Sequence, residues 1–146
     1  MPVYFYSEET KFKLTNRNIY RYWIEDFVKE KEKSIGELSF IFTTNEYLLE
    51  INKQYLNHNY FTDVITFNYN ELDIISGDIY ISVDQVKINS DELNVKFVHE
   101  LCRVMIHGVL HLLGWKDDNS EEMKIMRIME NRALKRLKEY ESGKGV

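Results

Sequence analysis

The sequence contains a single cysteine, Cys102, among 146 residues. No disulfide can form within the chain, which excludes the disulfide frameworks of many small secreted domains and makes a reducing compartment the expected setting. Cys102 lies in an apolar stretch, where a thiol usually behaves as a small buried hydrophobe and not as a nucleophile. We therefore assign no catalytic role to it.

The chain also lacks a long hydrophobic run and an excess of positive charge. No stretch reaches the roughly 18 apolar residues of a transmembrane helix, and the first residues lack the basic start and apolar core of a signal peptide. These absences predict a soluble, cytoplasmic protein with no membrane partner. The formal net charge is −5, whereas a nonspecific nucleic-acid binder is expected to be basic, so any RNA contact must come from a local patch.

Repeats, linkers and low-complexity segments are absent as well, and 146 residues are enough to bury a substantial core. We expect one domain over residues 1–146, with a frayed tail at residues 141–146. Apolar patterning predicts strands near 3–6, 37–43, 64–67 and 79–82, and helices near 15–33, 45–55, 83–90, 94–113 and 119–140. This irregular alternation indicates an α+β domain, with helices packed on a small mixed four-stranded sheet.

The candidate metal-ligating residues lie in and just after the apolar helix expected near residues 94–113. His107 and His111 are four residues apart, so they share one helix face with Cβ atoms about 5–6 Å apart, within reach of one metal ion. Gly114 stands where the helix would stop, because a residue without Cβ can adopt the left-handed conformation that reverses the chain. The reversal would return Asp117 and complete a two-histidine, one-carboxylate set with open positions. Asp118 is the alternative third ligand.

Two histidines at this spacing are a weak signal alone, since both could be ordinary core or surface residues. The apolar helix, the glycine and the returning acid together favour a metal site, and open coordination positions are typical of catalysis. His99 lies eight residues before His107 and about 80° around the helix from it, so we do not expect it to be a ligand.

The same residues carry a resemblance to the YbeY family, whose signature is HGxLHLxGxDH. The matching run is His107-Gly108-x-Leu110-His111-Leu112-x-Gly114-x-x-Asp117. Two further blocks occur in the family's order: Asn52-x-x-Tyr55 with Thr62-Asp63-Val64-Ile65-Thr66-Phe67, similar to LN…YR…TDVLSF, and Gly77-Asp78-Ile79-Tyr80-Ile81-Ser82, similar to GDIxIS. The resemblance covers about residues 38–133.

The resemblance implies a metal-dependent, single-strand-specific endoribonuclease with a zincin-like HxxxH helix. The family works in rRNA maturation, including the 3′ end of small-subunit rRNA, and in ribosome biogenesis, so rRNA and the ribosome or small-subunit proteins are the implied partners. It also implies one Zn²⁺ held by His107, His111 and Asp117. The family has histidine at the position of Asp117, an acid at that of Lys116 and an arginine at that of Leu56.

Three further residues are candidates for catalysis. Arg103 lies one turn before His107 on nearly the same face and could bind a substrate phosphate, although an ion pair with Glu100 is an equal alternative. His58 and Asp63 lie in a loop that enters a predicted strand, where scaffolds often present functional groups. A histidine there can act as acid or base, but solvated and turn-forming roles stay open for both residues.

Other functions fit the same ligands. A zinc peptidase of HExxH type carries its general base directly after the first histidine, and Gly108 occupies that position, so phosphodiester cleavage ranks above proteolysis. An iron oxygenase could use the same ligand set. A non-catalytic ribosome-assembly factor with a structural metal is the remaining alternative. For a nuclease, attack on phosphorus by an activated water or by the RNA's own 2′-OH is equally compatible with the sequence.

Overall fold

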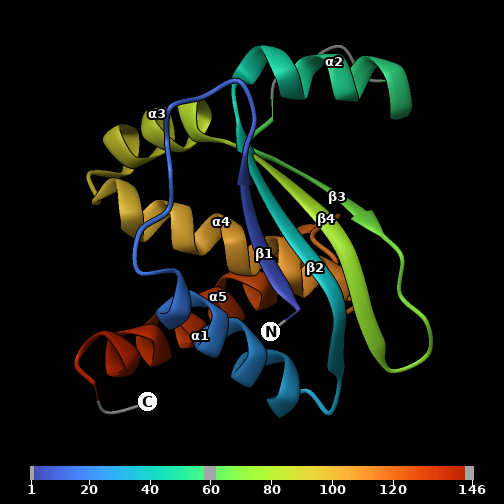
Figure 1. The fold of residues 1–146 in the computed structure, drawn as a ribbon, viewed down its shortest axis with the longest axis vertical. Helices are drawn as coiled ribbons and strands as arrows, with labels where there is room; N and C mark the ends of the chain where they lie inside the picture. The colour runs from blue at the N-terminus through green and yellow to red at the C-terminus, as the bar shows by residue number, and fades with distance from the viewer. Residues whose placement is uncertain (1, 58–61, 144–146) are drawn as a thin grey trace.

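A computed structural model describes residues 2–57 and 62–143 (Figure 1). His58 lies outside the described residues, as does part of the expected C-terminal tail. The described elements, in chain order, are β1 (Val3–Ser7), α1 (Arg17–Glu30), β2 (Ser34–Thr43), α2 (Asn45–Tyr55), β3 (Val64–Asn68), β4 (Ile74–Ser82), α3 (Val83–Leu93), α4 (Phe97–Leu112) and α5 (Ser120–Glu141).

The strands form one mixed sheet in the order β1-β2-β4-β3, which confirms the predicted α+β class. β1, β2 and β4 run parallel, and β3 is antiparallel to β4 at the edge. β2 and β4 both begin earlier than the sequence pattern predicts, because each continues through a glycine. A Cβ on Gly36 would lie 2.9 Å from Ile74 Cγ2, and the pairing register shifts between Ile35 and Leu38, so glycine permits a close strand contact here.

Helices pack against both faces of the sheet. Figure 1 shows α4 beside the sheet, α5 next to α4, α1 next to α5, and α2 across one end of the strands. Side chains of β4 alternate between the two faces: Ile79 and Ile81 join the main core, while Tyr80 packs on a second cluster that includes Leu48 of α2. The indole N–H of Trp23 donates to a carbonyl of α5 at 2.8 Å and ties α1 to that helix.

The helix that carries both histidines packs closely on the sheet at Gly108. A Cβ on Gly108 would lie 2.8 Å from Cγ2 of Ile79, so only a residue without a side chain lets α4 approach β4 this closely. This is also the position at which an HExxH peptidase carries its glutamate, and the packed strand leaves no space for that side chain. The contact therefore fixes the depth of α4 and argues against proteolysis.

Two local motifs shape the connection between α4 and α5. Gly114 has φ of +101°, its N–H donates to the carbonyl of His111, and the next N–H, from Trp115, donates to that of Leu110. These bonds form a Schellman motif, and the positive φ of Gly114 confirms the predicted left-handed stop of the helix. Asn119 then caps α5 by accepting from the N–H of Glu122 at 2.9 Å. None of the helices in the described part of the chain has the length and apolarity needed to cross a membrane.

Candidate metal centre

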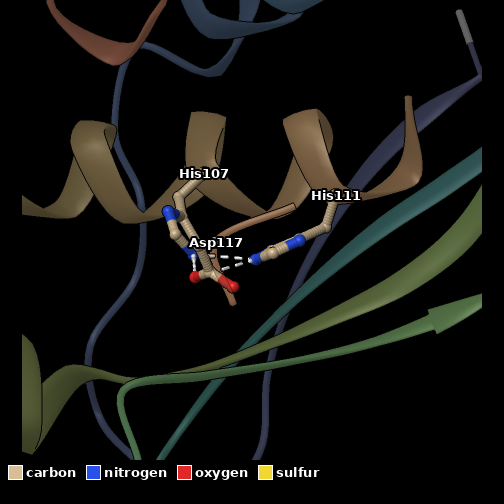
Figure 2. A group of neighbouring side chains, drawn as sticks. All are labelled: His107, His111 and Asp117. Carbon is tan, nitrogen blue, oxygen red and sulfur yellow. Dashed lines mark hydrogen bonds and ion pairs between the residues drawn. The ribbon is translucent and has the colours of Figure 1, made fainter. Parts of the chain in front are cut away.

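Three side chains converge at the C-terminal end of α4 (Figure 2). His107 and His111 come from successive turns of the helix, and Asp117 returns from the connection to α5. The two Nε2 atoms are 2.9 Å apart, and Oδ2 of Asp117 lies 3.2 Å from Nε2 of His107 and 3.3 Å from Nε2 of His111. A tetrahedral ion with metal–nitrogen distances near 2.0–2.1 Å holds its ligand atoms roughly 3.3 Å apart, so the spacing fits one ion.

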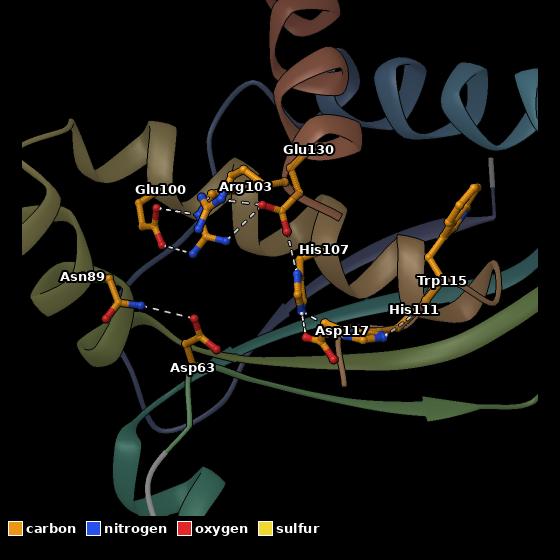
Figure 3. Close-up of polar contacts among 10 residues, drawn as sticks. Asp63, Asn89, Glu100, Arg103, His107, His111, Trp115, Asp117 and Glu130 are labelled. Atoms are coloured by element: carbon orange, nitrogen blue, oxygen red, sulfur yellow. Dashed lines mark hydrogen bonds and ion pairs between the residues drawn. The ribbon is translucent and has the colours of Figure 1, made fainter. Parts of the chain in front are cut away.

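The remaining nitrogens of the two rings show which atoms face the site (Figure 3). Nδ1 of His111 lies 3.0 Å from the carbonyl oxygen of Trp115, which can only accept a hydrogen bond. Nδ1 of His107 lies 2.6 Å from Oε2 of Glu130. Each Nδ1 is therefore the donor in its contact, and in the neutral form each ring directs an Nε2 lone pair at the other ring and at a carboxylate. Such a cluster of lone pairs fits a bound cation.

These three side chains line a pocket of about 640 Å³, so an ion held by them would be open to substrate on one side. The other lining residues come from α2, the segment before β3 and β3 itself, and they include Leu56, Thr62 and Asp63. The open coordination side and this pocket are what a hydrolytic site requires.

The predicted site residues are not all in this pocket. Asp63 lines it, and its carboxylate accepts from the side-chain amide of Asn89 at 3.2 Å. Burial raises the pKa of the Asp63 carboxyl, although the positive charge of Arg103 acts against that rise. Among the described residues, the ligand cluster uses Asp117 and does not include Asp118 or His99, both of which are exposed.

Arg103 points toward two buried carboxylates. Its guanidinium Nε donates to Glu100 at 2.8 Å, Nη2 forms a second close bond to the same carboxylate, and Nη1 lies 3.3 Å from Oε1 of Glu130. The pairing with Glu100 is thus the arrangement seen, and Arg103 is not among the residues that line the pocket. Its proposed contact with a substrate phosphate stays a prediction.

Sequence reasoning missed Glu130, which is 1% exposed and bonded to His107. Burial alone would raise the pKa of its carboxyl, but the hydrogen bond from His107 and the charge of Arg103 hold that pKa below its usual value. A signal for this residue was present: Glu130 lies on the apolar stripe of α5, between Met126 and Ala133, where a charged residue needs a buried partner.

Comparison with known proteins gives one consistent result. Residues 4–138 match the family described as endoribonuclease YbeY. The chain is 44% identical over 138 residues to the endoribonuclease YbeY of Azobacteroides pseudotrichonymphae, covering 94% of this chain and 99% of that protein. It is 45% identical over 130 residues to the endoribonuclease YbeY of Flavobacterium psychrophilum, covering 89% and 93%.

A solved structure agrees with these sequence matches. The solution structure of a protein from Thermotoga maritima has a TM-score of 0.69 to this chain at 30% identity, and the match covers 98% of this chain and 94% of that one. The resemblance carried by three short motifs is therefore confirmed over nearly the whole sequence, and this chain belongs to the endoribonuclease YbeY family.

Proposed function

We propose that this protein is a metal-dependent endoribonuclease that cleaves single-stranded RNA, with one zinc ion held by His107, His111 and Asp117. The observation that carries the proposal is the pair of Nε2 atoms, 2.9 Å apart, that face one carboxylate at the wall of an open pocket. Two nitrogens and one oxygen are ligands that zinc accepts in catalytic sites. The names of the curated relatives support RNA as the substrate.

A bound zinc ion would supply Lewis acidity, stabilising negative charge on a phosphoryl oxygen and lowering the pKa of a coordinated water. The chain's own residues would supply orientation and proton transfer. Asp63 lines this pocket, and burial raises the pKa of its carboxyl, which is the direction that a general acid requires. We assign it the role of a proton donor or acceptor at the scissile phosphodiester, and His58 stays a second candidate.

We further propose rRNA as the natural substrate, including the 3′ end of small-subunit rRNA, with the ribosome as partner and the cytoplasm as the compartment. The family match to residues 4–138 supports one domain acting as a unit. The net charge of −5 argues against tight nonspecific RNA binding. An enzyme of this kind would gain selectivity from a partner that presents the RNA.

The test is a cleavage assay with the zinc-loaded chain on single-stranded RNA and on the same sequence in a duplex. We expect cleavage of the single strand, and loss of both zinc and cleavage in His111→Ala. His99→Ala is the matched control, because His99 lies on the same helix but is exposed and outside the ligand cluster. Full cleavage by His111→Ala, or equal cleavage of the duplex, would contradict the proposal.

A further inference from the structure

A chain of buried charged side chains adjoins the candidate metal centre, and none of these side chains lines the pocket (Figure 3). It runs from Glu100 through Arg103 to Glu130 and ends on Nδ1 of His107. Side chains of the two glutamates are 1% and 2% exposed, and that of the arginine is 13% exposed. Burying three charged groups is costly, so an arrangement this complete calls for a reason beyond packing.

The charges in this chain do not cancel. Two buried carboxylates face one buried guanidinium. Among the described residues Arg127 also forms an ion pair with Glu130, at 3.7 Å, but its side chain is 54% exposed and solvent screens its charge. Excess negative charge therefore lies behind the imidazole of His107, whose opposite nitrogen faces the ligand cluster. A carboxylate in this position makes the imidazole more electron-rich and a better ligand for a cation.

The hydrogen bonds also restrict the ring. Oε2 of Glu130 accepts from His107 at 2.6 Å, while Oε1 faces Nη1 of Arg103 at 3.3 Å. Arg103 is itself held by both oxygens of Glu100. The Glu130 carboxylate thus has one orientation that satisfies all its partners, and this orientation keeps the His107 proton on Nδ1 and the lone pair on Nε2.

We propose that Glu130 is a positioning residue for the metal centre: held by Arg103, it fixes the ring and tautomer of His107 and strengthens the hold on the ion. This inference rests on the proposed metal site and adds a residue from α5, 23 positions away from His107 in the chain. It also gives Arg103 a role that differs from phosphate binding, because the arginine would act on zinc affinity through Glu130.

The test compares zinc affinity, by competition with a chromogenic chelator, in the natural protein, Glu130→Gln and Glu100→Gln. Glutamine has nearly the same shape as glutamate, but with its oxygen toward His107 its amide donors face Arg103. With the amide toward His107, the ring must carry its proton on Nε2. We expect Glu130→Gln to weaken zinc binding by about 10–100-fold. Glu100→Gln, equally buried on the same arginine but not touching His107, should weaken it by less than tenfold.

Each outcome of this comparison either supports or overturns the positioning role of Glu130. Unchanged affinity in Glu130→Gln, or an equal loss in both variants, would overturn the positioning role. If Glu130→Gln does not fold, nitrogen-15 NMR of the His107 ring in the metal-free natural protein replaces it: a proton on Nδ1 supports the inference, and a proton on Nε2 overturns it. Absence of zinc binding by the natural protein would instead refute the proposed metal site, so the two failures are distinguishable.

Discussion

Removing the metal should leave this protein folded but less stable. The main hydrophobic cluster joins β1, β2 and β4 to α1, α4 and α5, and none of the three proposed ligands belongs to it. The ligand side chains are 17–36% exposed and lie at the end of α4, outside that core. Chelation therefore removes an interaction at the edge of the fold, not the element that holds it together.

The expected change in Tm follows from the linkage between zinc binding and folding. Zinc at 100 times its dissociation constant stabilises a protein that binds it only when folded by about 2.7 kcal/mol. At about 2–4 °C per kcal/mol for a chain near this length, chelation should lower Tm by about 5–11 °C. The assay is thermal melting with zinc and with a chelator, with near-UV circular dichroism at 25 °C as a check on tertiary structure.

Two variants make the melting assay specific. His111→Ala should melt at the same temperature with zinc and with chelator, whereas His99→Ala should keep the full shift. Cooperative loss of the near-UV signal when the natural protein is chelated at 25 °C would refute the reasoning. It would favour instead the alternative of an assembly factor whose metal is structural.

Three further predictions concern single positions. Gly108→Ala should cost up to about 2 kcal/mol in urea unfolding, because overpacking against Ile79 outweighs the roughly 1 kcal/mol that alanine adds in a helix; a more stable variant would contradict the close contact. Cys102, whose pKa burial raises to about 12, should react with a thiol reagent at pH 8 only in denaturant. Asp63→Asn should abolish RNA cleavage yet raise the Tm of the metal-free protein at pH 7. A raised pKa means that folding penalises the ionised carboxyl, so the gain should disappear as the pH falls below the carboxyl's usual value; a lower Tm at pH 7 would be the opposite result.

Much of the fold could be predicted because its signals are local. The helical stripes, the stop glycine Gly114 and the capping residue Asn119 act within a few positions of the backbone that they shape. The starts of β2 and β4 were wrong because a glycine inside a strand looks like a break. Gly77 shows why it is not one here: a Cβ at that position would lie 2.5 Å from the carbonyl oxygen of Phe67, a contact that only the folded sheet creates.

The residues of the candidate metal centre also fall into two groups: those that are close in sequence and those that come from distant segments. His107, His111 and Asp117 lie within eleven consecutive positions, so helix geometry and one turn were enough to bring them together in prediction. The pocket wall and the buried charges come from distant segments. Nothing in the local pattern relates the oxygen of Glu130 to a ring 23 residues earlier, because that contact depends on how α5 packs on α4.

The turn between α4 and α5 therefore positions residues on both sides of the two histidine rings. Its first half, closed by the Schellman bonds of Gly114 and Trp115, places Asp117 opposite the two histidines and also leaves the carbonyl of Trp115 as the acceptor for His111. Its second half, capped by Asn119, starts α5 so that Glu130 reaches the back of the His107 ring. The acceptors of both Nδ1 atoms and the third proposed ligand thus follow from one short connection. A change in its length would disturb all three together, even with His107, His111 and Asp117 still present.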